Sequence, residues 1–460
     1  MEELQLQLET QIAKHNVPGA SLALLHEGDA QLAAAGFANQ PEGISANTDT
    51  VFQIGSITKV FTATLMLKLA EQGRVELDGP VSRYLPDLRI EGATAPEELT
   101  VRSLLDYSAG MEGDFFEDFG PDPQALERYV AACRDLQFIH RPGAMRAYNS
   151  TAYCIAGRVI ETLTGQYFND ALAEHLLRPL GLEKYGFYTH DVLRYRTAVG
   201  HTSDGSSFSI VKNLRLPHCM SAAGASLSMT ARDLLRFGQF HLDGGRTGAA
   251  EQFISSAGIE AMRTPYAIVP PQNSELLMGW AALQAGATRV TVASGATPGQ
   301  NSFLIIVPEQ EFAVSILSNS GDGATRLFLD FGLSLIKELT GLDLEMPPQG
   351  TTPPSDSQIP EGDALDAFCG TFCNGSRIEI QRTGDELLAT SKAKVPGTAD
   401  EFDTDTSRLI AMGDRVFGIV PEGGDQVIGT LEFLQQEPGS DTLSHIAYSG
   451  RVFCRERKIG

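Results

Sequence analysis

Two residues in the stretch GSITKVFTATLMLKLAEQG, residues 55–73, have the types and the spacing that acyl-transfer chemistry needs. Ser56 and Lys59 stand three residues apart, so on a helix their side chains share one face and lie within contact range. A serine hydroxyl becomes a nucleophile when a base lies beside it, and a buried lysine can serve as that base. The stretch is otherwise apolar nearly all round, which predicts a helix inside the protein.

The place of Lys59 in this helix supports a chemical role. The first turn of a helix carries unpaired N–H groups and favours Asp or Glu, so a cation there is mildly unfavourable. The spacing alone is not specific, because the chain contains four such pairs: Ser56–Lys59, Ser209–Lys212, Ser334–Lys337 and Ser391–Lys394. Only Ser56 follows a glycine at the start of a predicted buried helix. The ordinary alternative is an N-cap serine with a lysine that reaches solvent.

Other catalytic patterns are missing or weak. The sequence has no GxSxG elbow, HExxH, Walker loop or GxGxxG. The nine histidines do not cluster, and the CxxxC pair Cys369 and Cys373 lacks a nearby histidine, so we expect no metal and no cofactor. His218 and Cys219 are adjacent, but adjacent residues in a strand point apart, which argues against a thiol nucleophile with its base.

Charge and hydropathy limit the partners. The 460-residue chain has a net charge of −23, which repels phosphate backbones and anionic membranes, so we expect no nucleic-acid partner. Its first residues lack the regions of a signal peptide, and no stretch approaches the roughly 18 apolar residues of a membrane span. We therefore expect a cytoplasmic protein without a membrane partner.

The elements around Ser56 indicate an α/β chain of the α+β type. Apolar runs bounded by turn residues predict strands at 20–28, 30–38, 288–295, 301–309 and 312–320. A helical pattern follows at 324–341, and further helical patterns occupy 101–110, with Thr100 as N-cap, 151–165 and 230–245. The two groups of strands can form one antiparallel sheet with the terminal helices packed on it.

The C-terminal part of the chain has a different pattern. Residues 346–362 are rich in Pro, Ser and Thr without an apolar period, which indicates a linker. Residues 363–460 alternate short apolar runs with turn residues, a pattern typical of a small barrel or sandwich.

Several stretches together resemble one family of enzymes. They are VPGASLALLHEG, the stretch around SITK, LTVRSLLDYSAGM, RPGAMRAYNSTAYCIAGRVIE, AAGASLSMTARDLLRFGQFHLDGG and SGATPGQNSFLIIVPEQEFAVSILSNS. In their residues and in their order along the chain, these stretches resemble the sequences of the class C β-lactamase and penicillin-binding-protein-like serine hydrolases. The resemblance covers about residues 1–345. The resemblance implies a β-lactamase/transpeptidase-like fold, with a central antiparallel sheet and a helical subdomain, and a lipocalin-like β-barrel appended at 363–460.

The resemblance also implies further site residues. In this family the tyrosine of a YxN motif works with the lysine as general base, and the corresponding residues here are Tyr148, Asn149 and Ser150. The tyrosine matches, whereas a serine replaces the asparagine of the motif. Ser150 is either a shorter polar group that contacts substrate or the N-cap of the next helix.

A third family motif, Lys or His followed by a small residue and Gly, aligns with Ala293, Ser294 and Gly295. The family cation is therefore absent, and the substrate is either neutral at this end or meets a cation on another element, such as a loop of the C-terminal domain. Ser294 and Gly295 keep a substrate-binding role by resemblance. The N–H groups of Ser56 and Ala296 can form an oxyanion hole, because main-chain donors do not depend on side-chain identity.

We therefore expect a serine hydrolase of the β-lactamase-like family, an esterase, amidase or peptidase that forms an acyl-enzyme. Its substrate would be a small molecule or short peptide with an amide or ester bond. An acyltransferase, transesterase or peptide cyclase would use the same site, so the sequence leaves both open. A non-catalytic binding protein on this fold is the alternative from another class, and homo-oligomer formation stays open.

Overall fold

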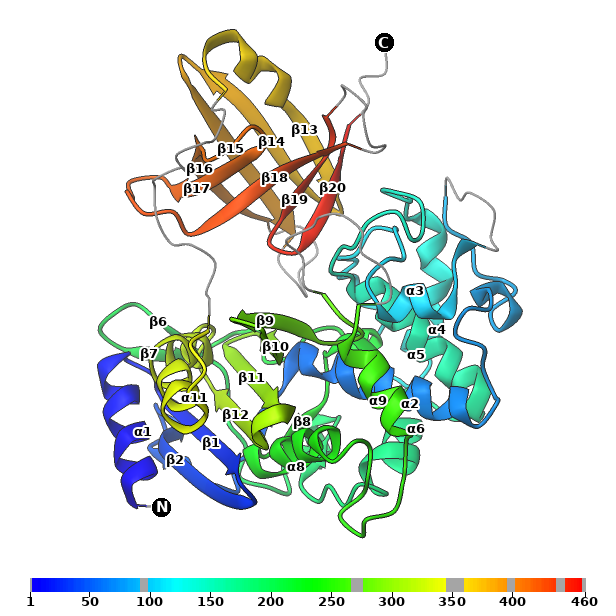
Figure 1. Ribbon diagram of the computed structural model, residues 1–460, viewed down its shortest axis with the longest axis vertical. Helices are drawn as coiled ribbons and strands as arrows, with labels where there is room; N and C mark the ends of the chain where they lie inside the picture. The colour runs from blue at the N-terminus through cyan, green and yellow to red at the C-terminus, as the bar shows by residue number, and fades with distance from the viewer. Residues whose placement is uncertain are drawn as a thin grey trace.

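The computed structural model describes residues 2–91, 98–265, 276–344, 360–394, 402–435 and 443–456. Figure 1 shows an α+β body with a β-barrel above it. The predicted linker 346–362 falls mostly outside the described residues. Within the described residues, no helix is long and apolar enough to cross a membrane.

A seven-stranded antiparallel sheet forms the centre of the body, in the order β3-β2-β1-β12-β11-β10-β9. Its strands are β1 (Gly19–His26), β2 (Asp29–Asn39), β3 (Ile44–Ser45), β9 (Ala281–Ala285), β10 (Thr288–Thr297), β11 (Gln300–Val307) and β12 (Phe312–Ser318). The single antiparallel sheet predicted from the two groups of strands is confirmed.

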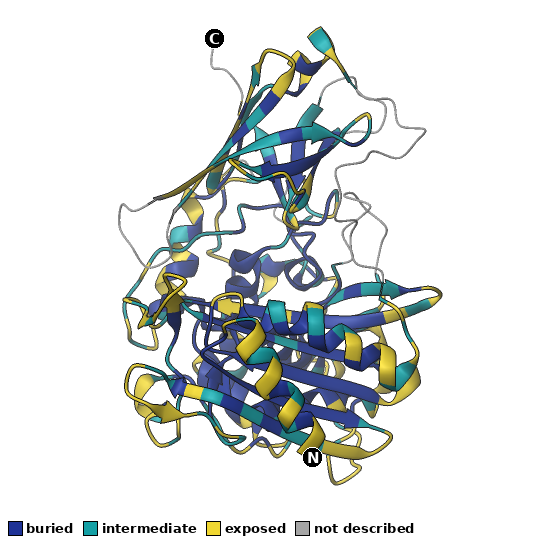
Figure 2. Cartoon of the chain, turned by 90° about the vertical axis from the view of Figure 1, so that its left-hand side faces the viewer, coloured by how far each residue is buried: buried dark blue, intermediate teal, exposed yellow. Residues whose placement is uncertain are grey.

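Strand β1 shows why its sequence is apolar without alternation. Leu22 and Leu24 enter one core, and Ala23 and Leu25 enter another on the opposite face. A strand that is covered on both faces reads as a continuous apolar run. Figure 2 shows these strands buried beneath partly exposed helices.

Terminal helices cover one face of the sheet, as expected. They are α1 (Glu2–Lys14), α10 (Gly323–Leu327) and α11 (Leu333–Thr340). A π-helical turn at Phe328–Gly332 joins the last two, so the predicted helix 324–341 is interrupted in the middle. The other face carries α8 (Ala231–Leu242), whose N-cap Thr230 accepts a hydrogen bond from the Asp233 amide.

The helical subdomain surrounds the stretch that holds Ser56. Its helices are α2 (Thr58–Glu71), α3 (Val101–Leu105), α4 (Ala125–Ala132), α5 (Ser150–Thr164), α6 (Phe168–Leu172), α7 (Thr189–Val192) and α9 (Ser256–Arg263). Thr100 caps α3 as predicted. Short strands complete the body: β4 (Phe52–Gln53), β5 (Tyr185–Gly186), β6 (His201–Ser203), β7 (Phe208–Ile210) and β8 (Ser228–Met229).

The C-terminal part is a closed eight-stranded barrel. Of the two folds predicted for it, the barrel is confirmed and the sandwich is wrong. Its strands are β13 (Gly370–Asn374), β14 (Ser376–Thr383), β15 (Glu386–Lys394), β16 (Phe402–Ala411), β17 (Val416–Pro421), β18 (Gly429–Gln435), β19 (Leu443–Tyr448) and β20 (Arg451–Arg455). Phe368 packs inside against Phe417 and Phe433, with ring centroids 4.9 and 4.7 Å away. Aromatic side chains thus occupy its interior.

The barrel docks on the body through an apolar cluster made by Met145, Ala147, Leu434, Ala447 and Val452. At the edge of this cluster, His445 Nε2 lies 2.9 Å from the carbonyl oxygen of Ile139. The hairpin of β19 and β20 points from the barrel toward the body (Figure 1). The barrel is therefore joined to the body by buried contacts as well as by the chain.

Candidate active site

Ser56, Lys59 and Tyr148 lie in mutual contact, and Ser56 and Tyr148 line a cavity. Lys59 Nζ is 3.1 Å from Ser56 Oγ and 2.7 Å from Tyr148 Oη, and Tyr148 Oη is 2.6 Å from Ser56 Oγ. Each of these three atoms thus lies within hydrogen-bonding distance of the other two. The Tyr148 oxygen is placed to receive the proton that leaves the serine hydroxyl, and Lys59 contacts both oxygens.

The local fold explains the lysine in the first helical turn. A 3₁₀ turn at Gly55–Ile57 leads into α2, and most residues of both elements are buried. Lys59 is 0% exposed, and its Nζ also donates to the carbonyl oxygen of Ala223 at 2.7 Å. A buried ammonium needs oxygen partners, and Lys59 has three. The alternative of a lysine that reaches solvent is wrong.

Two glycines allow the chain to pack tightly around Ser56. Gly55 has φ +52°, and a Cβ there would lie 2.6 Å from the amide nitrogen of Ala296. A Cβ on Gly224 would lie 2.5 Å from the carbonyl group of Gly55. Only glycine fits either position. The close approach places the amide of Ala296 beside the main chain that carries Ser56.

Strand β10 forms one wall of the cavity through Ser294, Gly295 and Ala296. Side chains from β11 hold this strand in place, because Asn301 Nδ2 donates to the carbonyl oxygen of Gly295 at 2.9 Å. Ser302 Oγ donates to the carbonyl oxygen of Ile54 at 2.8 Å and so ties β11 to the segment before the nucleophile.

Ala293 does not line the cavity. Its side chain is 5% exposed and belongs to the main core. Successive residues of a strand point to opposite faces, so Ala293 faces the core when Ser294 and Ala296 face the cavity. The position that holds the family cation therefore faces the core here and not the cavity.

The residues after Tyr148 have separate tasks. Asn149 caps α5, because its Oδ1 accepts a hydrogen bond from the Ala152 amide at 2.7 Å. Ser150 is the first residue of the helix and lines the cavity. The alternative in which Ser150 is the N-cap is therefore wrong, and its hydroxyl is available on the cavity side.

The environment of Tyr148 favours its ionised form. Burial acts to raise the pKa of the phenol, but the charge and hydrogen bond of Lys59 outweigh it, and the hydrogen bond with Ser56 adds to their effect. The pKa of Tyr148 is lowered as a result. The Arg451 guanidinium contributes in the same direction.

Arg451 comes from the barrel, at the tip of the β19–β20 hairpin. Ser449, Gly450 and Arg451 line the same cavity as Ser56. The guanidinium carbon of Arg451 lies 5.1 Å from the ring centroid of Tyr148. The sequence pattern indicates a turn here but not where the turn docks. From the sequence we expected that a loop of the C-terminal domain could supply a cation, but the sequence did not indicate which residue.

The cavity has a volume of about 830 Å³. Apolar side chains from several segments of the body line it, namely Phe116, Val211, Leu216, Met220 and Leu276. Its polar side chains include those of Ser56, Ser150 and Asn301. Such a mixture of apolar walls and a few polar groups is typical of a site for a small molecule.

The other groups considered as catalytic or metal-binding candidates do not lie in such a site. Residues His218–Ala223 form a 3₁₀ helix rather than the strand assumed from the sequence, and Cys219 donates its thiol to the carbonyl oxygen of Glu117. Burial raises the pKa of the Cys219 thiol to about 12, so it is protonated at neutral pH. Among the described residues, no group of three or more His, Cys, Asp or Glu could hold a metal ion.

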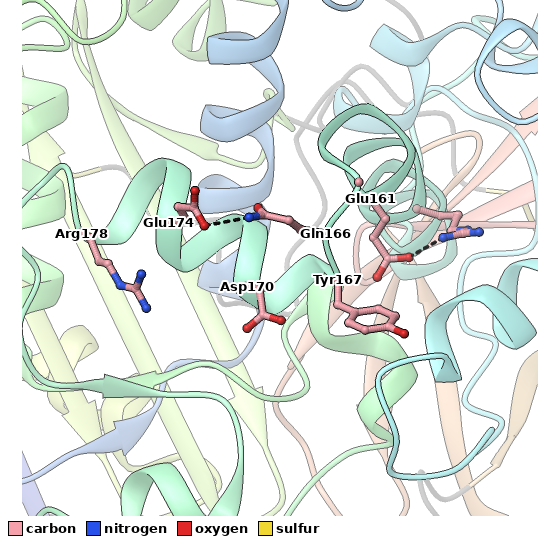
Figure 3. Close-up of a pocket in the computed structure, with 8 residues that line it drawn as sticks. Glu161, Gln166, Tyr167, Asp170, Glu174 and Arg178 are labelled. Atoms are coloured by element: carbon pink, nitrogen blue, oxygen red, sulfur yellow. Dashed lines mark hydrogen bonds and ion pairs between the residues drawn. The ribbon is translucent and has the colours of Figure 1, made fainter.

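A second hollow, of about 620 Å³, lies at the end of α5 and along α6 (Figure 3). Its charged and polar side chains mostly bond to one another: Arg158 Nη1 lies 2.9 Å from Glu161 Oε2, and Gln166 Nε2 lies 2.7 Å from Glu174 Oε2. This hollow contains no counterpart of the serine, lysine and tyrosine cluster among the residues that line it. We therefore place the candidate active site at Ser56.

The fold and this site define a class of protein that comparison identifies. The family model described as Beta-lactamase matches residues 6–335, and the chain belongs to this family. The resemblance inferred from the sequence motifs is thereby confirmed. Penicillin-binding protein 4 of Amycolatopsis lactamdurans is 34% identical over 349 residues, which cover 75% of this chain and 90% of that protein.

Solved structures extend the similarity to the barrel. The crystal structure of SurE is 25% identical with a TM-score of 0.79, and the match covers 99% of this chain and 98% of that chain. The structure of SurE with D-Leu is likewise 25% identical, with a TM-score of 0.76 and 99% coverage of both chains. The arrangement of body and barrel is thus shared with a known structure.

Proposed function

We propose that this chain is a serine hydrolase that forms an acyl-enzyme on Ser56 and cleaves an amide or ester bond in a small molecule or short peptide. The contacts among Ser56, Lys59 and Tyr148 beside the cavity carry this proposal. Membership of the β-lactamase family supports it.

In the proposed reaction, Ser56 Oγ attacks the carbonyl carbon of the substrate while its proton passes to the ionised oxygen of Tyr148. The proton then reaches the leaving amine or alcohol, which departs as the acyl-enzyme forms. Lys59 stabilises the phenolate before it takes up the proton and after it has passed the proton on. The amides of Ser56 and Ala296 stabilise the negative oxygen of the tetrahedral intermediate. Water, activated in the same way, then releases the acid.

The cavity favours a peptide-like substrate that does not require a free carboxylate. Arg451 is the only Lys or Arg among the described residues that line the cavity, and Asp114 already neutralises it. The similarity to SurE, whose structure with D-Leu matches over body and barrel, supports a substrate with a D-amino acid residue next to the scissile bond.

Intact-mass measurement of the acyl-enzyme tests this function. The protein is mixed with p-nitrophenyl esters of N-acetyl-D-leucine and N-acetyl-L-leucine, and the mass gain is mapped by peptide digestion. We expect one acyl group on Ser56, with faster acylation by the D-ester. Failure of every ester to label Ser56 would contradict the proposal.

The same experiment decides between hydrolysis and acyl transfer. The two reactions share the acyl-enzyme and differ in the second nucleophile, so products are compared with and without an added amine. The apolar residues Phe116, Leu216 and Met220, which line the same cavity as Ser56, suit an apolar acceptor. An amide product that increases with amine concentration would identify acyl transfer.

A further inference from the structure

The barrel contacts Tyr148 at two points. The main-chain N–H of Tyr148 donates to the carbonyl oxygen of Gly450 at 2.7 Å. The Arg451 guanidinium lies against the ring of the same tyrosine, 5.1 Å from its centroid, while the ring of Tyr107 stacks on it at 5.4 Å. The backbone and the ring of Tyr148 therefore both depend on where the hairpin docks.

Arg451 is itself held in place by the body. Its Nε and Nη2 donate to the two carboxylate oxygens of Asp114, the second bond at 3.2 Å. This is a two-point contact, which fixes orientation as well as charge. The Asp114 side chain is 10% exposed, so the pair is largely removed from solvent.

The segment that carries Asp114 also connects the barrel to the start of α5. The Gly113 amide donates to Oδ1 of Asn374 in β13 at 2.9 Å. The carbonyl oxygen of Gly113 accepts a hydrogen bond from the Ser150 amide at 2.9 Å, two residues after Tyr148. A continuous set of hydrogen bonds thus runs from the barrel through Gly113 to the helix that follows the tyrosine.

We propose that Arg451, anchored by Asp114, is a positioning residue for Tyr148, and that the β19–β20 hairpin is thereby a working part of the active site. The inference deepens the proposed function and rests on it for the role of Tyr148 as base. Arg451 acts in two ways: it holds the phenol ring within reach of Ser56, and its positive charge favours the phenolate.

The kinetic test uses the full chain and p-nitrophenyl acetate, a small ester without a carboxylate. The variants are Arg451→Met, Arg451→Lys and Asp114→Asn. Arg377→Met is the matched control, because Arg377 also lies in the barrel but its side chain is 52% exposed and pairs with Glu456.

We expect Arg451→Met to lower kcat by about tenfold or more with little change in KM, within the usual contribution of a positioned base. The acid limb of kcat/KM should move to higher pH by about one unit, because the loss of a neighbouring cation raises the pKa of a phenol. Arg451→Lys should recover part of that pH shift. Asp114→Asn should lower kcat although the cation remains, and Arg377→Met should match wild type.

A spectroscopic titration measures Tyr148 independently of turnover. Phenolate absorbance is followed against pH, and the curve of Tyr148→Phe is subtracted from that of each protein. Tyr148 should ionise at higher pH in Arg451→Met than in wild type. Thermal unfolding identifies any variant that fails to fold, in which case Arg451→Lys and Asp114→Asn carry the test.

The outcomes separate the two proposals. Unchanged kcat, pH profile and tyrosine titration in Arg451→Met would overturn the positioning role, and so would an effect confined to KM, which would mean that Arg451 contacts substrate. If no ester acylates Ser56 in wild type, the proposed function fails, while the tyrosine titration still decides whether Arg451 acts on Tyr148.

Discussion

The phenol oxygen of Tyr148 lies 2.6 Å from the Oγ of Ser56, although 92 residues separate the two in the sequence. Lys59 Nζ lies within 3.1 Å of both oxygens, so one buried cation touches both the nucleophile and the proposed base. This arrangement lets the phenolate form of Tyr148 accept the proton of Ser56 without a change in the position of the ring.

Ser56→Ala should abolish turnover and acylation with little change in thermal unfolding, because a small hydroxyl contributes little to packing but carries the covalent step. Release of p-nitrophenol and intact mass measure the two effects. Ser334→Ala is the matched control, since Ser334 also precedes a lysine by three residues but donates its hydroxyl to the Asp330 carbonyl. Retention of more than a few per cent of activity in Ser56→Ala would place the nucleophile elsewhere.

Tyr148→Phe should lower kcat by about two to four orders of magnitude, the range for a positioned acid or base. The ring and its contact with Tyr107 remain, so thermal unfolding should change little. Lys59→Met should lower kcat at least as much, and it also leaves the Ala223 carbonyl without its donor. Stopped-flow acylation rates test both variants, and near-normal rates with Ser56 still essential would show that the base lies elsewhere.

Alkylation of cysteines should leave activity intact. Cys133, Cys154 and Cys219 are buried, and burial raises the pKa of the first and third thiols to about 12. Treatment of the native protein with iodoacetamide at pH 8 should therefore leave these three unmodified, as peptide mapping can show. Denatured protein, in which all six react, is the control. Inactivation in step with a label on Cys219 would revive the thiol nucleophile.

Two buried histidines should make stability depend on pH. Burial lowers the pKa of His140 to about 4 and that of His241 to about 3, against about 6.5 in an unfolded chain. The unfolded state therefore binds more protons between these values. Their stabilising contribution is complete above about pH 6.5 and decreases as the pH falls toward 4 and 3.

Urea unfolding at pH 7 and pH 5 tests this dependence. His140→Gln should show a smaller loss of unfolding free energy between the two pH values than wild type. His190→Gln is the control, because the His190 side chain is 72% exposed. An equal pH dependence in His140→Gln and wild type would show that His140 does not contribute.

Much of the fold follows from local patterns. Apolar runs with bounding turns predict β1, β11 and β12, because these strands are buried on both faces of the sheet. The run in β10 is likewise buried from Val290 to Ala293, before the strand reaches the cavity. The π-helical turn at Phe328–Gly332 is not predictable in this way, since the apolar residues continue through it.

The candidate site is also only partly predictable from the sequence. The i, i+3 spacing brings Ser56 and Lys59 together from sequence alone, whereas Tyr148 required the family resemblance because its contact is long-range. The alternation of side chains along β10 predicts that Ala293 and Ser294 face opposite sides of the strand. The comparison with the family motif considered only which residue types match and not which way they point. Arg451 could not be placed, because no local pattern records where a hairpin docks.

The contact between Arg451 and Asp114 joins residues that are 337 positions apart, and this separation has a consequence during synthesis. Domains generally fold in the order in which the ribosome makes them, so the body can fold before the barrel is complete. During that interval the Tyr148 amide has no Gly450 carbonyl, and its ring has no guanidinium beside it. On our proposal, a newly made chain holds its nucleophile before the barrel completes the surroundings of its base, so full activity requires barrel docking.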